Sequence, residues 1–81
     1  MKANLYRDDP DALRTLYDVQ QLLKVFGIYV YVGKRLWDIE MMALELDHLH
    51  EMNAIDKPTW LKAKVVLNHE HRLEEKKLAQ G

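Results

Sequence analysis

The chain has 81 residues, no cysteine and a formal net charge of −1. This length is enough for one small domain, and a charge near zero gives no general attraction to nucleic acid. The lack of cysteine excludes disulfides and thiolate chemistry. Hydrophobic residues make up 48% and charged residues 31% of the sequence, which is typical of a folded globular domain.

The N-terminal segment, residues 1–14, lacks the apolar core of a signal peptide. The uncharged run over residues 25–33 is too short to span a bilayer. We therefore expect a soluble, cytoplasmic protein that makes no contact with a membrane. Residues 1–14 are expected to form an N-terminal extension, partly disordered or with a short helix at Pro10, ahead of a bundle domain over residues 15–81.

The first helix of the bundle is predicted from about Thr15 to Phe26, where apolar residues recur at helical spacing. Thr15, with Asp18 three residues later, resembles a capping box, and Gly27 is a typical C-terminal stop. Pro10, preceded by an aspartate, offers an earlier start. Both starts remain open from the sequence.

An extended apolar connection is predicted over about residues 28–33, IYVYVG, between the first two helices. Its residues favour a strand, but the chain offers no second strand to pair with it. Side chains of an extended segment alternate between two sides. The side expected to pack on the bundle is Ile28, Val30 and Val32, and the outward side is Tyr29 and Tyr31.

The second helix is predicted from Lys34 or Arg35 to Met52 and has two apolar faces. The second face requires a partner, which is either the N-terminal extension, through Leu5, Tyr6 and Leu13, or another copy of the protein. The expected core face is Leu36, Ile39, Met42, Ala43, Leu46 and Leu49; the opposite stripe is Trp37, Met41, Leu44 and Met52, with His48 among them.

The third helix is predicted to begin after Asp56, a suitable N-cap, with Pro58 in its first turn. Glu70 falls in the middle of its apolar stripe, so the helix is expected to continue beyond the bundle. Short connections place successive helices antiparallel, which favours an all-α, up-down-up three-helix bundle. The expected core residues of this helix are Trp60, Ala63, Val66 and Leu67.

A pattern of residues in the first two thirds of the chain indicates a family. It consists of Tyr17, Asp18, Val19, Gln20, Gln21, Leu22 and Leu23, followed by Gly33, Arg35, Asp38, Glu40 and Met42. With this pattern the sequence resembles the YqgQ-like family of short bacterial proteins over roughly residues 15–76. The resemblance implies a small three-helix bundle and does not indicate a particular biochemical activity. Lys34 departs from the acidic residue expected there, and residues 1–14 precede the usual start.

Catalytic and metal sites are not predicted. The chain has no serine, and Thr15 and Thr59 are explained as helix-start residues. The histidines occur as pairs two residues apart, at 48 and 50 and at 69 and 71, and such pairs point about 200° apart on a helix. We therefore expect no enzyme activity, no metal, no cofactor and no small-molecule substrate.

Two binding functions are compatible with the pattern. Tyrosines beside cations and a helix N-terminus are suited to stacking bases and holding phosphate, which indicates single-stranded nucleic acid, or else a phosphate or nucleotide. The alternatives are that the rings only cover helix ends, or that a protein partner or second copy binds the second apolar stripe. The candidate nucleic-acid residues are Lys24, Tyr29, Tyr31, Lys34 and Arg35; the candidate protein interface is Trp37, Met41 and Leu44.

Overall fold

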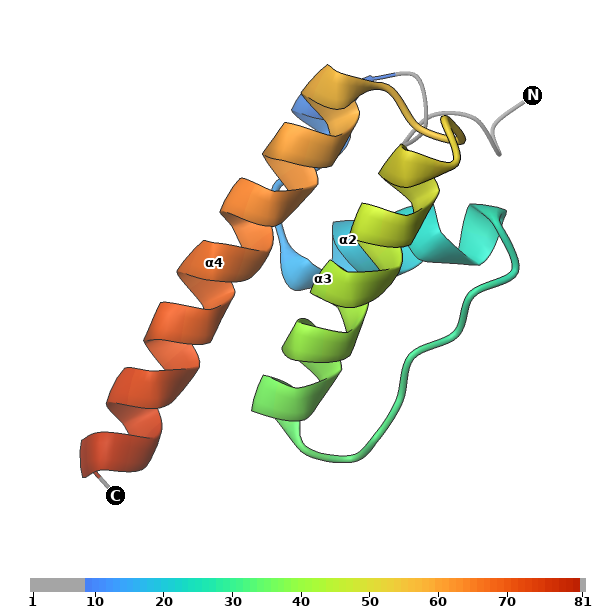
Figure 1. The fold of residues 1–81 in the computed structure, drawn as a ribbon. Coiled ribbons are helices and arrows are strands. Elements are labelled where there is room, and N and C mark those ends of the chain that lie inside the picture. The colour runs from blue at the N-terminus through green and yellow to red at the C-terminus, as the bar shows by residue number, and fades with distance from the viewer. Residues whose placement is uncertain (1–8, 81) are drawn as a thin grey trace.

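The computed structural model describes residues 9–80, in which all regular secondary structure is helical (Figure 1). This confirms the predicted all-α fold with three main helices. The sequence allowed a short helix at Pro10, and the structure has the 3₁₀ helix η2 there. The elements are η2 (Pro10–Ala12), α2 (Leu16–Val25), α3 (Arg35–Glu51) and α4 (Lys57–Gln80).

The ends of α2 are fixed by local hydrogen bonds. Thr15 Oγ1 accepts from the Asp18 N–H at 3.3 Å, while Asp18 Oδ2 accepts from the Thr15 N–H at 3.0 Å, which is the predicted capping box. Gly27 has φ +76°, and its N–H donates to the Lys24 carbonyl at 2.9 Å. The helix therefore stops in a Schellman motif, where glycine tolerates the left-handed backbone.

Helices α3 and α4 lie side by side and antiparallel (Figure 1). Asn53 adopts φ 60° after α3, and the following N–H, from Ala54, donates to the Leu49 carbonyl at 2.8 Å. Asparagine thus takes the left-handed position that glycine usually occupies. Asp56 Oδ1 accepts from the Thr59 N–H at 2.9 Å and caps α4, as predicted.

Helix α2 runs across the α3–α4 pair and packs on both helices (Figure 1). Leu13, which follows η2, is fully buried and joins the same core. Trp60 is half-buried at the edge of the core, where its ring stacks on His50 with the centroids 4.2 Å apart. The core consists of Leu13, Leu16, Val19, Leu22, Leu23, Ile39, Met42, Leu46, Leu49, Ile55, Ala63, Val66 and Leu67.

The structure corrects two details of the predicted packing. Val32 was expected to pack on the bundle, but its side chain is 51% exposed, because the chain leaves the core at this point to turn into α3. Leu36 was expected in the core, but it is only half-buried and lines a groove between the start of α3 and the end of α4. Helix α2 crosses the pair away from this end, so the first turn of α3 packs mainly on α4.

Polar contacts fix the register between α3 and α4. Asp47 Oδ1 accepts from Trp60 Nε1 and from Lys64 Nζ, both at 2.9 Å. The bonds from Lys64 and Trp60 stabilise the carboxylate and lower the pKa of Asp47. Nearer the start of α3, Glu40 Oε2 lies 3.0 Å from His71 Nε2, so the two helices are joined at two levels.

His71 gives this contact a pH dependence. The hydrogen bond to Glu40, with a further contribution from Glu75, raises the pKa of His71 above its ordinary value of 6.5. Because the pKa of His71 is higher in the folded than in the unfolded state, its protonation stabilises the fold. This stabilisation is complete below the pKa of the unfolded state and is lost as pH rises through the pKa of the folded state. We expect the melting temperature of the wild type to exceed that of Glu40→Gln at acidic pH. This difference should shrink toward alkaline pH, and a constant difference across the pH series would contradict the assignment.

Candidate nucleic-acid interface

The connection between α2 and α3 carries two exposed tyrosines. Tyr29 is 73% exposed and Tyr31 is 87% exposed, whereas Ile28 and Val30 are partly buried and pack against the core. The side chains therefore alternate between the core and solvent over these four residues, as the sequence predicted. At this exposure the two rings cover little of the bundle surface.

Two hydrogen bonds hold the ends of the connection to the bundle. The Ile28 N–H donates to the Leu23 carbonyl at 3.0 Å, and the Val32 N–H donates to Asp38 Oδ1. Gly33, with φ +109°, then turns the chain into α3. The tyrosines are thus presented from a short segment that is anchored on both sides.

Helix α3 begins with backbone N–H groups that have no partner within residues 9–80. Lys34 is the N-cap residue, and no side chain of the described chain caps this end. Free N–H groups and the helix macrodipole favour an anion here. Lys34 Nζ lies 5.1 Å from the centroid of the Trp37 ring, so a cation and a half-exposed aromatic ring stand together at the helix start.

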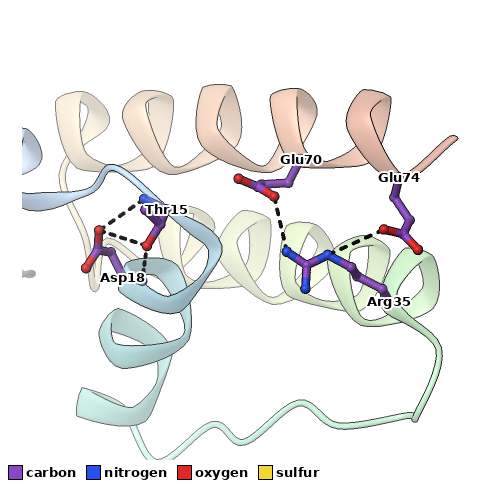
Figure 2. A network of polar contacts seen from close by, with 5 residues as sticks. All are labelled: Thr15, Asp18, Arg35, Glu70 and Glu74. Atoms are coloured by element: carbon purple, nitrogen blue, oxygen red, sulfur yellow. Dashed lines mark hydrogen bonds and ion pairs between the residues drawn. The ribbon is translucent and has the colours of Figure 1, made fainter. Parts of the chain in front are cut away.

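Arg35, in the first turn of α3, reaches across to α4. Its Nη2 lies 3.2 Å from Glu70 Oε1, and its Nε lies 3.6 Å from Glu74 Oε1 (Figure 2). Both glutamate side chains are largely buried beside it, whereas the Arg35 side chain is half-exposed. The ion pairs explain why Glu70 interrupts the apolar stripe of α4. They also place acidic groups next to the proposed phosphate site.

The same end of the molecule contains a groove of about 410 Å³. Its lining combines cationic, aromatic and aliphatic groups, with one carboxylate. A groove of this composition can cover the side of a base or sugar while the cations meet a phosphate. The lining residues are Lys34, Arg35, Leu36, Trp37, Glu74 and Leu78.

Lys24 stands apart from the other candidate residues. It is exposed in the last turn of α2, and Figure 1 shows the connection running from this end of α2 to the start of α3. The structure therefore brings Lys34, Arg35 and Trp37 together, with Tyr29 and Tyr31 along the segment leading to them. Lys24 lies at the far end of that segment.

The outer stripe of α3 is exposed within the described chain. Trp37, Met41 and Leu44 are 53%, 40% and 48% exposed. Leu13, one of the residues expected to cover this stripe, instead lies in the core, and η2 packs against α4. Leu5 and Tyr6 lie outside the described residues.

The sequence reasoning missed two contributors to this site. Trp37 was assigned to a protein interface, although its ring also pairs with the neighbouring Lys34. Glu74 was not singled out, because its contact with Arg35 depends on how α3 and α4 align. The signal that could have indicated the second contact was Glu70, a carboxylate in an apolar stripe four residues earlier.

The chain is similar to known sequences over most of its length. The YqgQ-like family pattern matches residues 13–73. The uncharacterized protein YqgQ of Bacillus subtilis (strain 168) is 48% identical over 58 residues, which cover 72% of this chain and 82% of the relative. Among the described helices, none has the length and apolar character needed to cross a membrane.

Proposed function

The chain belongs to the YqgQ-like family, whose pattern covers both the connection and the start of α3, and we propose that it is a non-enzymatic module for single-stranded nucleic acid. We place this function in the bacterial cytoplasm. The observation that carries the proposal is the outward projection of Tyr29 and Tyr31 from an anchored segment. Exposed rings stack on bases of any sequence, and both rings are exposed to solvent within residues 9–80.

The start of α3 supplies the phosphate contact in this proposal. Its uncapped N–H groups and Lys34 attract an anion, and Trp37 offers a third ring beside them. Each phosphate held on a single strand lowers log affinity by about 0.7 per tenfold rise in salt. We therefore expect weak binding that is stronger at low salt, because few cations take part.

Glu74 is expected to oppose binding, since it neutralises Arg35 next to the phosphate site. Glu74→Gln removes one of the two carboxylates that contact the guanidinium and leaves Glu70 in place, so it should strengthen binding of a fluorescent oligothymidylate. Because the Arg35 side chain is half-exposed, the contact is treated as a surface ion pair of about 0.2–1 kcal/mol, which corresponds to an increase of roughly 1.4- to 5-fold at low salt. Fluorescence anisotropy titrations at low and high salt measure the change.

Glu75→Gln is the matched control, because it removes the same charge from the next residue of α4. Glu75 contacts His71, with Oε1 3.4 Å from Nδ1, and makes no contact with Arg35. Equal gains in both variants would show a general charge effect rather than release of Arg35. If the wild type does not bind the oligothymidylate at low salt, the proposed function is wrong.

A second candidate function is favoured by the exposed stripe of α3. Three large apolar side chains in line on one helix face, opposite the buried face, are typical of a surface that binds a protein partner. Met41→Glu places a charge in the middle of that stripe without touching the tyrosines. If Met41→Glu binds the oligonucleotide as well as the wild type does, the stripe has either a separate role or none.

A further inference from the structure

The backbone of the connection has two edges with different surroundings. In an extended segment, the N–H and C=O groups of alternate residues point to the same edge. The N–H groups of Ile28 and Val32 both donate to the protein's own bundle, to the Leu23 carbonyl and to Asp38. The opposite edge therefore carries the N–H and C=O groups of Tyr29 and Tyr31, which have no hydrogen-bond partner within residues 9–80.

An unpaired extended edge is a template for another strand. Proteins usually protect such edges with charged residues, proline or a covering element, and residues 28–32 contain neither charge nor proline. The segment is held at both ends and through Ile28 and Val30, so little ordering entropy remains to oppose pairing. Figure 1 shows it passing along the outside of the molecule.

We propose that this edge pairs antiparallel with the same segment of a second copy, with the two-fold axis at Val30. The sequence is suited to this arrangement, because the aliphatic and tyrosine positions alternate symmetrically about that residue. Tyr29 then stands opposite Tyr31 of the second copy, and the two pairs exchange four backbone hydrogen bonds. The bonds use the N–H and C=O groups of Tyr29 and Tyr31 on the outer edge. The N–H groups of Ile28 and Val32 keep their present partners, the Leu23 carbonyl and Asp38.

The same register accounts for the exposed Val32. Residues opposite each other in an antiparallel pair project on the same face, so Val32 meets Ile28 of the second copy. The four tyrosines project on the other face. The inference goes beyond oligonucleotide binding and does not require it, since the pairing uses backbone groups and the aliphatic face.

Sedimentation equilibrium of the full chain without oligonucleotide, from micromolar to millimolar concentration, tests the pairing. A two-stranded ribbon is weak on its own, so the dimer should form toward the upper end of this range. The wild-type mass is expected to rise from 9.6 kDa toward twice that value. A mass that stays monomeric throughout would overturn the proposal.

Three variants distinguish pairing through the backbone edge from contacts made by the side chains. Tyr31→Pro removes an outward N–H and should remain monomeric, while Tyr31→Ala removes only the ring and should still dimerise. Val30→Pro removes an inward N–H and should also dimerise, which controls for the stiffness of proline. A dimer that survives Tyr31→Pro, in a variant with the wild-type circular dichroism spectrum, would contradict pairing through this edge.

Isotope-filtered NMR detects the pairing directly. In a mixture of labelled and unlabelled chains, an intermolecular nuclear Overhauser effect is expected between the Val30 Hα protons. Residues at a non-hydrogen-bonded antiparallel pair bring their Cα atoms to about 4.5 Å. Intermolecular contacts confined to Met41 and Leu44 would instead assign the dimer to the α3 stripe and overturn the strand pairing.

Discussion

Replacing both Tyr29 and Tyr31 by alanine is expected to weaken binding of a single-stranded oligonucleotide roughly 30-fold. Stacking of a base on an aromatic ring contributes about 1–3 kcal/mol, and rings on an exposed connection should lie near the lower end. Two rings at about 1 kcal/mol each give the stated factor, since 1.4 kcal/mol corresponds to tenfold in affinity. Anisotropy titration of the double variant beside the wild type measures the loss.

The substitution has two matched controls. Tyr17→Ala removes a tyrosine that is 62% exposed in the first turn of α2, outside the connection, and should leave binding unchanged. Phenylalanine at positions 29 and 31 keeps the stacking rings and should retain most of the affinity. If Tyr17→Ala and the double alanine variant lose affinity equally, the connection has no special role.

Replacing Leu13 by alanine is expected to lower the free energy of unfolding by about 2–5 kcal/mol. The side chain is fully buried in the core that α2, α3 and α4 share, although it precedes the three main helices. The cost includes both the lost apolar burial and the cavity that remains. A domain of this size has a total stability of only about 4–12 kcal/mol, so the effect should be plain in urea denaturation followed by circular dichroism.

Leu61→Ala makes the same chemical change at a position that is 46% exposed on α4. Its effect should stay within about 0.5 kcal/mol, as for most surface substitutions. If the two variants lose equal stability, the segment before α2 is not an integral part of the folded unit. A larger loss for Leu13→Ala shows that the core requires residues ahead of α2.

The parts of the fold that depend on near neighbours in the sequence could be predicted. The capping box at Thr15 and Asp18, the stop at Gly27 and the cap at Asp56 each involve residues within a few positions. The helical periodicity likewise indicated most of the core. Asn53 was missed as the left-handed residue after α3, because asparagine adopts that backbone conformation less regularly than glycine.

The parts that depend on how the helices align could not be predicted from the chain. Arg35 meets Glu70 and Glu74 only because α3 and α4 pack antiparallel in one register, and these residues are 35 or more positions apart in the sequence. The exposure of Val32 follows from the path of the connection around the bundle. The exposure of Tyr29 and Tyr31 follows from local alternation and could be predicted from the sequence, whereas the ion pairs of Arg35 required the tertiary structure.

Mapping amide chemical shifts during addition of an oligothymidylate tests the central claim most directly, since it shows where a single strand touches the protein. The account predicts saturable changes at Tyr29, Tyr31, Lys34 and Trp37, which weaken as salt is raised. Changes confined to the basic residues of α4, or no changes at low salt, would contradict it.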